Sequence, residues 1–140
     1  MRLLTLILFI CLCIGCATPK QANTNSNILN GTWVPVQEEM GGTMFPKAAY
    51  ENQRLTISDS IYTFIAESID KGVVKTSVDK MDIYGKEGVN TGKHFTAIFK
   101  YDNGLLTICY NLLGESYPQA YETKGKPMYF LSVFKKEPMK

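Results

Sequence analysis

The feature that most constrains the fold is a pair of alternating apolar and polar runs, 93–101 and 105–110, on either side of Asp102-Asn103-Gly104. Alternation with a period of two places successive side chains on opposite faces of a β-strand. An Asn-Gly pair favours the two-residue turn whose twist matches that of its flanking strands. This segment therefore predicts an antiparallel β-hairpin with one face directed towards a core.

Similar short runs occur along the rest of the chain, separated by turn residues such as Asp59-Ser60. The eight candidate strands are 32–38, 54–58, 61–66, 73–78, 81–84, 93–101, 105–110 and 128–136. Short strands with close, even connections are typical of a β-sandwich or an up-and-down barrel. Pro35 falls inside the first of these strands, which predicts a bulge or a sheet edge there, because proline has no N–H to donate.

Two segments do not read as strands. Residues Pro46–Gln53 could form one or two helical turns beside the barrel, with Pro46 in the first turn. Leu113–Pro127 is a fifteen-residue connection, and connections of this length in a compact domain are often functional.

The N-terminus has the three parts of a secretory signal. Met1-Arg2 is basic, Leu3–Ile14 is apolar apart from one threonine, and Gly15-Cys16 precedes a polar stretch. A membrane-spanning helix needs roughly 17–25 apolar residues, so this run is too short to be a permanent anchor. We expect residues 1–15 to be a cleaved signal peptide.

The residues Cys13-Ile14-Gly15-Cys16 resemble the lipobox of bacterial lipoproteins, although Cys13 stands where leucine is usual. The resemblance implies cleavage before Cys16 and attachment of acyl chains such as palmitate to that cysteine. Ala17 stands where an aspartate would signal retention in the inner membrane, so an outer membrane, facing the periplasm, is expected. The alternative is an ordinary secretory signal that happens to contain a cysteine.

The remaining sequence divides into a tether and one domain. Residues 16–29 combine the lipidated cysteine with a polar stretch that cannot bury enough surface to order itself, and 30–140 has the size of a single domain. Only Cys109 of the four cysteines lies in that domain, so no disulfide is expected within it. Without Arg2 the net charge falls from +2 to +1, which gives no argument for a nucleic-acid partner.

The segment Leu29-Asn30-Gly31-Thr32-Trp33 matches the Leu-x-Gly-x-Trp opening of lipocalin-like domains. Further matching segments follow in order: 54–57, 97–102, 105–109, Pro118 and 131–136. From Ile28 to Glu137 the chain resembles a lipocalin-like domain family of unknown function that is abundant in planctomycetes. The resemblance implies an all-β, antiparallel, up-and-down eight-stranded barrel with one short helical segment and with Trp33 at its closed end. Tyr117 departs from the arginine usual before Pro118, and the family supplies no catalytic residues to carry over.

No constellation of residues indicates catalysis, a metal or another cofactor. His94 is the single histidine and is expected at the surface, while Cys109 lies in an apolar strand and is expected to behave as a small hydrophobic residue. The carboxylates have no diagnostic spacing; those considered are Glu38, Glu39, Asp59, Asp70, Asp79 and Asp82. We therefore predict no catalytic residues, no metal ligands and no enzyme activity.

The aromatic residues could line a cavity or fill a core. The candidates are Trp33, Tyr62, Phe64, Phe95, Phe99, Tyr110, Phe130 and Phe134. An eight-stranded barrel is either filled by side chains or holds one small ligand, and the sequence leaves both alternatives open. In the second case we expect the entrance near Pro46–Tyr50 and Tyr117–Tyr121.

These features favour a membrane-tethered, non-enzymatic binding module for a small apolar or amphipathic molecule. The alternative is an envelope protein that binds another protein, as an inhibitor or as an immunity protein against a toxin.

Overall fold

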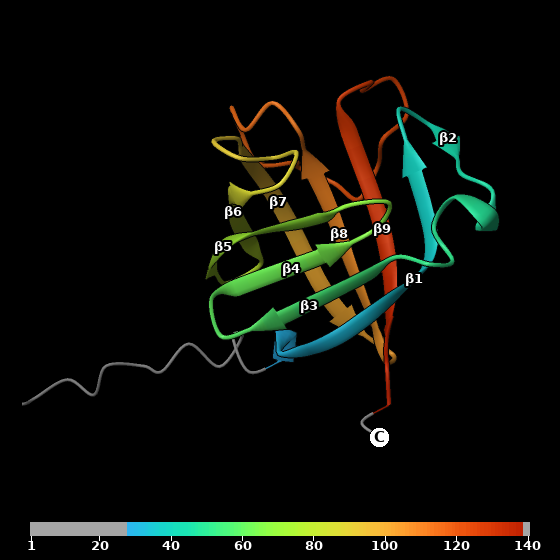
Figure 1. The fold of residues 1–140 in the computed structure, drawn as a ribbon. Helices are drawn as coiled ribbons and strands as arrows, with labels where there is room; N and C mark the ends of the chain where they lie inside the picture. The colour runs from blue at the N-terminus through green and yellow to red at the C-terminus, as the bar shows by residue number, and fades with distance from the viewer. Residues whose placement is uncertain (1–27, 139–140) are drawn as a thin grey trace, which may run out of the picture.

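The computed structural model describes residues 28–138, which form an antiparallel sheet that curls round and closes on itself (Figure 1). The strands are β1 (Gly31–Met40), β2 (Thr43–Met44), β3 (Arg54–Ser58), β4 (Ile61–Ile65), β5 (Ile69–Ser77), β6 (Lys80–Glu87), β7 (His94–Asp102), β8 (Leu105–Asn111) and β9 (Tyr129–Lys136). Eight of them make the barrel, and pairing of β1 with β9 closes it. The predicted up-and-down eight-stranded barrel is confirmed; the two-residue strand β2, beside the end of β1, was not predicted.

Strand β1 contains the irregularity that Pro35 predicts. Its register with β9 shifts between Pro35 and Gln37, so that Val36 is an extra, outward-facing residue. The carbonyl oxygen of Val36 accepts a hydrogen bond from the hydroxyl of Tyr50 at 3.1 Å. Tyr50 follows a single 3-10 turn, Lys47–Ala49, which is shorter than the helical segment predicted for 46–53.

Strands β5 and β6 are longer than predicted, because the low β-propensity of glycine hides the parts of the strands around Gly72 and Gly85. Gly72 and Gly85 pair across the two strands. A Cβ atom at Gly72 would lie 2.0 Å from the carbonyl oxygen of Tyr84, so no larger residue fits at this point. Glycine has low β-propensity, but here it allows two strands to approach closely.

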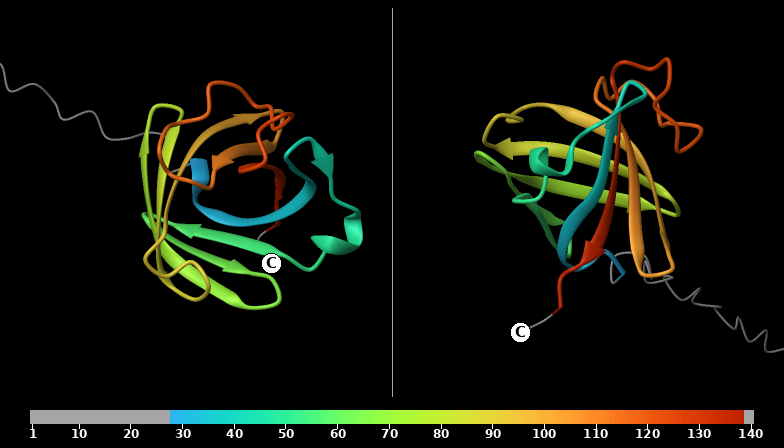
Figure 2. Two further views of the ribbon diagram at one scale, coloured as in Figure 1. Left: turned by 90° about the horizontal axis from the view of Figure 1, so that it is seen from above. Right: turned by 90° about the vertical axis from the view of Figure 1, so that its right-hand side faces the viewer.

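The two ends of the barrel are built differently (Figure 2). One end carries the tight turns at 59–60, 78–79 and 103–104, and the other carries the connections 41–53, 66–68, 88–93 and 112–128. Asn103 and Gly104 have φ angles of 50° and 79°, the left-handed conformation that the Asn-Gly pair predicts for this hairpin. We call the end with the tight turns the closed end and the other the open end.

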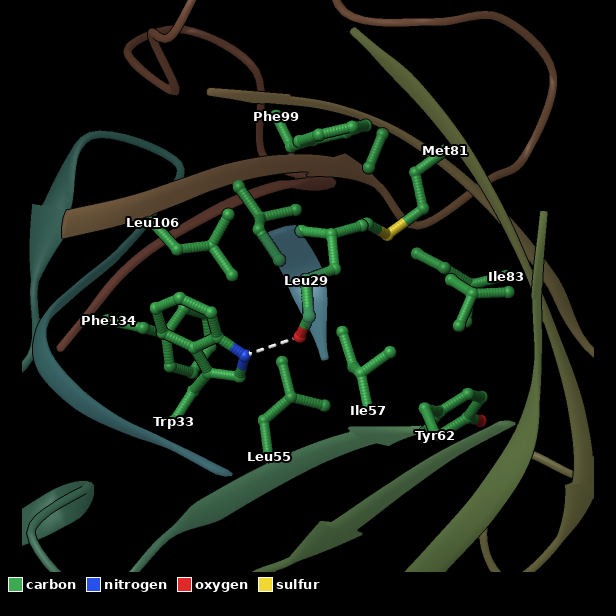
Figure 3. Packing of buried hydrophobic residues seen from close by; sticks show 13 residues of the cluster. Leu29, Trp33, Leu55, Ile57, Tyr62, Met81, Ile83, Phe99, Leu106 and Phe134 are labelled. Carbon is green, nitrogen blue, oxygen red and sulfur yellow. Dashed lines mark hydrogen bonds between the residues drawn. The ribbon is translucent and has the colours of Figure 1, made fainter. Parts of the chain in front are cut away.

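A hydrophobic core fills the closed end (Figure 3). Trp33 is fully buried there, and its indole N–H donates a hydrogen bond to the carbonyl oxygen of Leu29 at 2.8 Å. Leu29 is also buried, so the prediction of a flexible tether is wrong for this residue, whose apolar side chain packs inside the barrel. The predicted signal peptide 1–15, Cys16 and the tether up to residue 27 lie outside the described residues.

The core residues of the described chain lie between Leu29 and Phe134, and the β1–β9 pairing that closes the sheet includes Trp33 with Lys136. The strands that the structure describes lie between Gly31 and Lys136, C-terminal to the predicted signal peptide and lipid site. Across residues 28–138 there is no helix with the length and apolar composition needed to cross a membrane.

The long connection 112–128 covers part of the barrel's outer surface. Its Tyr117 and Tyr121 pack against a small outer cluster that contains Ile98, Cys109 and Leu131. Cys109 is completely buried beneath it, and this burial raises the pKa of its thiol. The thiol therefore stays protonated, as expected for a cysteine that serves as a small hydrophobic residue.

Candidate functional site

The barrel contains a cavity of about 500 Å³, and residues of the core cluster, among them Leu55, Ile57 and Met81, form part of its wall. This volume lies within the roughly 300–1,000 Å³ that is typical of small-molecule sites. Its lining is mostly apolar and comprises Glu38, Leu55, Ile57, Tyr62, Phe64, Asp70, Val74, Met81, Ile83, Asn90, Lys93, Phe95, Ile108, Tyr110, Leu112, Met128, Phe130 and Phe134. The barrel therefore combines the two alternatives that the sequence left open, a filled core at one end and a hollow at the other.

The predicted aromatic residues all face the inside of the barrel, but in two groups. Trp33 and Phe99 belong to the packed core and do not line the cavity. The six that line it are Tyr62, Phe64, Phe95, Tyr110, Phe130 and Phe134. Aromatic residues thus supply much of the apolar wall.

The predicted entrance segments do not line the cavity. Tyr117–Tyr121 lies against the outer surface of the sheet, and Tyr50 is held against the outside of β1 by its hydrogen bond to Val36. The lining residues nearest the mouth are Asn90 and Lys93 from connection 88–93, and Leu112 and Met128 from the two ends of connection 112–128.

Two carboxylates line the cavity, and one of them, Asp70, accepts several hydrogen bonds from neighbouring residues. It accepts hydrogen bonds from the Tyr62 hydroxyl at 2.8 Å and from the backbone and side-chain nitrogens of Asn90, each at 3.0 Å. Burial and this contact with Asp70 raise the pKa of Tyr62, which keeps its hydroxyl protonated as a donor. Asp70 therefore anchors connection 88–93 to the barrel wall.

Glu38 is the other carboxylate, and it is poorly satisfied. Its side chain is almost completely buried, and the hydroxyl of Ser132 lies 3.4 Å from Oε1, beyond the usual length of about 2.7–2.8 Å for such a bond. Burial raises the pKa of Glu38 to about 7, and hydrogen bonding to Ser132 and Gln53 offsets only part of that effect. Near neutral pH its carboxyl group is thus divided between the protonated and ionised forms.

Sequence reasoning included Glu38 and Asp70 among scattered carboxylates but did not predict their place in the cavity. In β1 the buried Trp33 and Pro35 set an alternation that would direct Glu38 outwards. The extra residue Val36 reverses that alternation, and Glu38 pairs with the inward-facing Ser132. Pro35 predicts that a bulge is present. The exact position of the bulge decides which side chains of β1 point into the barrel.

His94 lies on the outer surface, as predicted, but not alone. Its Nε2 atom is 2.8 Å from Oδ1 of Asp82, its ring stacks on Tyr84, and the hydroxyl of Tyr117 donates a 2.6 Å hydrogen bond to Oδ2 of Asp82. Partial burial alone would raise the pKa of Asp82, but the hydrogen bonds from Tyr117 and His94 outweigh it and hold this pKa below its ordinary value. The arrangement ties connection 112–128 to the sheet.

The hydrogen bonds of the outer His94–Asp82 pair join it to Tyr117. Among residues 28–138, no group of three or more histidine, cysteine, aspartate or glutamate residues is placed to hold a metal ion. The cavity, rather than this pair, is the candidate site.

No protein-family model, curated protein or solved structure matches this chain. The arguments about function that follow depend on the geometry of the barrel itself and on the sequence features described above.

Proposed function

We propose that this protein is a membrane-tethered, non-enzymatic, lipocalin-like binding module that holds a small apolar or amphipathic molecule inside its barrel. The observation that carries the proposal is the cavity of about 500 Å³, whose wall is mostly aliphatic and aromatic. It lies between a packed core and the connections of the open end, so a ligand would enter from one side.

The expected driving force is the hydrophobic effect. Each methylene group that moves from water into such a cavity gains about 0.8 kcal/mol. Residues on all sides of the barrel contribute apolar surface, among them Leu55 of β3, Ile83 of β6, Ile108 of β8 and Phe130 of β9. A flexible apolar chain would thus exchange water for contacts on every side.

A soluble chain of residues 17–140, which starts after the predicted lipid site and contains the complete barrel, tests the proposal. We expect the uncharged apolar fluorophore N-phenyl-1-naphthylamine to bind to it with a stoichiometry near one, and native mass spectrometry to detect co-purified lipid. Circular dichroism confirms that the chain is folded. A folded chain that neither binds the fluorophore nor carries lipid would refute the proposal.

The membrane tether is a separate part of the proposal and rests on residues 1–16 alone. We propose that Cys16 carries acyl chains such as palmitate and that the barrel faces the periplasm from the outer membrane. The full-length protein, expressed in a bacterium grown with labelled palmitate, should incorporate the label, and the Cys16→Ser variant should not. Equal labelling of both proteins would exclude lipidation at this cysteine.

The alternative role in binding a protein would use the outer surface. Ile61, Ile65 and Ile69 are exposed there, on the outward side of β4 and β5. Exposed apolar side chains of this kind are common on monomeric proteins and do not define a partner. The cavity therefore favours the small-molecule role.

A further inference from the structure

We propose that the ligand of the cavity is an amphipathic cation, with an apolar tail in the barrel and a protonated amine paired with the carboxylate of Glu38. This inference rests on the proposed function, since it names the chemical class of the molecule held at the same site.

The first argument is the difference between the two carboxylates of the cavity wall. Asp70 accepts hydrogen bonds from Tyr62 and Asn90 at 2.8–3.0 Å and serves the structure of the protein. Glu38 is at least as deeply buried, at 2% exposure, but its contact with Ser132 is long. A buried carboxylate without strong donors is costly, and stability alone would favour an apolar side chain in its place.

The second argument is the weakness of the donors around Glu38. The Oε1 atom of the neighbouring Gln53 is buried and has no hydrogen-bond partner in the part of the chain that the structure describes. The Nε2 atom of Gln53 instead donates to the carbonyl oxygen of Ala49 at 3.2 Å. Hydrogen bonding from Ser132 and Gln53 offsets only part of the effect of burial on Glu38, so a ligand that carries several N–H donors would complement this carboxylate of the cavity wall.

The third argument is charge. The charged side chains of the cavity wall are Glu38, Asp70 and Lys93. Lys93 is exposed at the mouth, where its ammonium group donates a 3.2 Å hydrogen bond to Oδ1 of Asn90. Because Lys93 is solvated and Glu38 is not, a charged head inside the cavity experiences mainly the negative charge.

The chemistry of Glu38 selects a cation rather than a neutral donor. Burial raises the pKa of its carboxyl group to about 7, so ionisation there is disfavoured. A protonated amine in contact would favour the ionised form and form charge-assisted hydrogen bonds, which are roughly twice as strong as neutral ones. A fatty acid would instead bring a second anion into the cavity.

Three ten-carbon probes that differ only in the head group test the proposal: n-decylamine, n-decanol and n-decanoate. Binding to residues 17–140 is measured by calorimetry at pH 8 and below the micelle-forming concentrations. We expect decylamine to bind at least tenfold more tightly than decanol, and decanoate to bind more weakly than either. The Glu38→Gln variant should lose the preference for the amine while its affinity for decanol changes less than about twofold.

The matched control is Glu67→Gln, which makes the same change at an exposed position in the turn between β4 and β5. This variant should keep the preference for decylamine over decanol. If Glu67→Gln loses as much of this preference as Glu38→Gln does, the effect of the charge is long-range and the proposed contact is wrong. A second measurement needs no substitution: at pH 5, where Glu38 is protonated, the wild-type affinity for decylamine should fall at least tenfold. The other titratable groups of the cavity wall are Tyr62, Asp70, Lys93 and Tyr110.

The outcomes separate the two proposals. If decylamine and decanol bind equally well, or if the anion binds most tightly, the inference about the cation is refuted and the binding module stands. If none of the probes binds to the folded chain, both proposals fail.

Discussion

The closed and open ends of this barrel contain similar residues but use them for different purposes. At the closed end Leu29, Trp33 and Leu106 are buried with at most 1% exposure and pack against one another in a continuous core. At the open end, Phe64, Phe95 and Tyr110 are only partly buried and surround a cavity. Apolar composition alone does not distinguish a stabilising core from a binding site; the difference is whether other side chains fill the space between the rings.

The polar groups differ in the same way. At the closed end the indole N–H of Trp33 has a well-placed acceptor in Leu29. At the open end the Glu38 carboxyl group has a long contact with Ser132, and hydrogen bonding from Ser132 and Gln53 offsets only part of the effect of its burial. A natural protein that keeps a buried, weakly paired carboxylate sacrifices stability there, which is common at functional sites.

The largest expected difference between the two ends is in the free energy of unfolding that is lost when one aromatic ring is removed at each end. Trp33→Ala removes a fully buried ring and leaves the Leu29 carbonyl oxygen without its donor, so the free energy of unfolding should fall by about 3–5 kcal/mol. Phe64→Ala, whose ring already faces the cavity, should cost less than half as much. Urea denaturation of both variants measures the difference, and equal losses would show that the two ends contribute equally.

The raised pKa of the Glu38 carboxyl group should make the stability of the protein depend on pH. Its pKa is about 4.5 in the unfolded chain and about 7 in the folded barrel, so between these values only the unfolded chain is ionised. Stability should therefore fall as the pH rises from 4.5 to 7 and stay level above that. At about 1.4 kcal/mol per pH unit, the total loss is about 3 kcal/mol.

Glu38→Gln should remove this part of the pH dependence and be more stable than the wild type at pH 8 in the absence of ligand. Chemical denaturation at pH 5 and pH 8 tests both expectations, with Glu67→Gln as the exposed control. A Glu38→Gln variant that is less stable than the wild type at pH 8 would contradict the picture of a poorly satisfied carboxylate.

Filling the hollow end should make it resemble the closed end. Val74→Phe places a larger side chain in the cavity, which should raise the free energy of unfolding by about 0.5–2 kcal/mol and weaken binding of n-decanol at least tenfold. The matched control is Val73→Phe, because Val73 alternates with Val74 and faces outwards. Unchanged decanol binding in Val74→Phe would place the bound molecule elsewhere.

The smallest effect is expected on the outer surface. Tyr117→Phe removes the 2.6 Å hydrogen bond to Asp82, whose charge and contact raise the pKa of Tyr117 to about 12. Because the Tyr117 hydroxyl is near solvent, its removal should lower the free energy of unfolding by about 1 kcal/mol or less. The affinity for decanol should be unaffected. Hydrogen exchange should show faster opening of connection 112–128; a large loss of binding would mean that this connection shapes the cavity after all.

Much of the fold follows from local sequence. The Asn103-Gly104 turn, the alternation in β7 and β8 and the interruption at Pro35 each specify a local conformation through backbone sterics, and the structure has all three. The lengths of β5 and β6 do not follow in this way, because Gly72 and Gly85 are favourable only when the two strands face each other.

The candidate site was predicted only in part. Six of the eight predicted aromatic residues line the cavity, since alternation identifies the side chains that point inwards. The predicted entrance segments, Pro46–Tyr50 and Tyr117–Tyr121, belong to connections of the open end but do not line the cavity. Local sequence does not show whether a long connection folds over the mouth or over the outer wall. Connection 112–128 covers the wall, where its tyrosines bury Ile98 and Cys109.

The sequence by itself determined an all-β chain of short antiparallel strands and the set of side chains that face inwards where alternation is unbroken. Only the tertiary structure decided that the closed end is filled and the open end hollow, because packing depends on which inward-facing side chains meet across the barrel. It also decided the orientation of Glu38. The one-residue bulge at Val36 reverses the alternation of β1 and turns a carboxylate that simple periodicity would direct to solvent into the wall of the cavity.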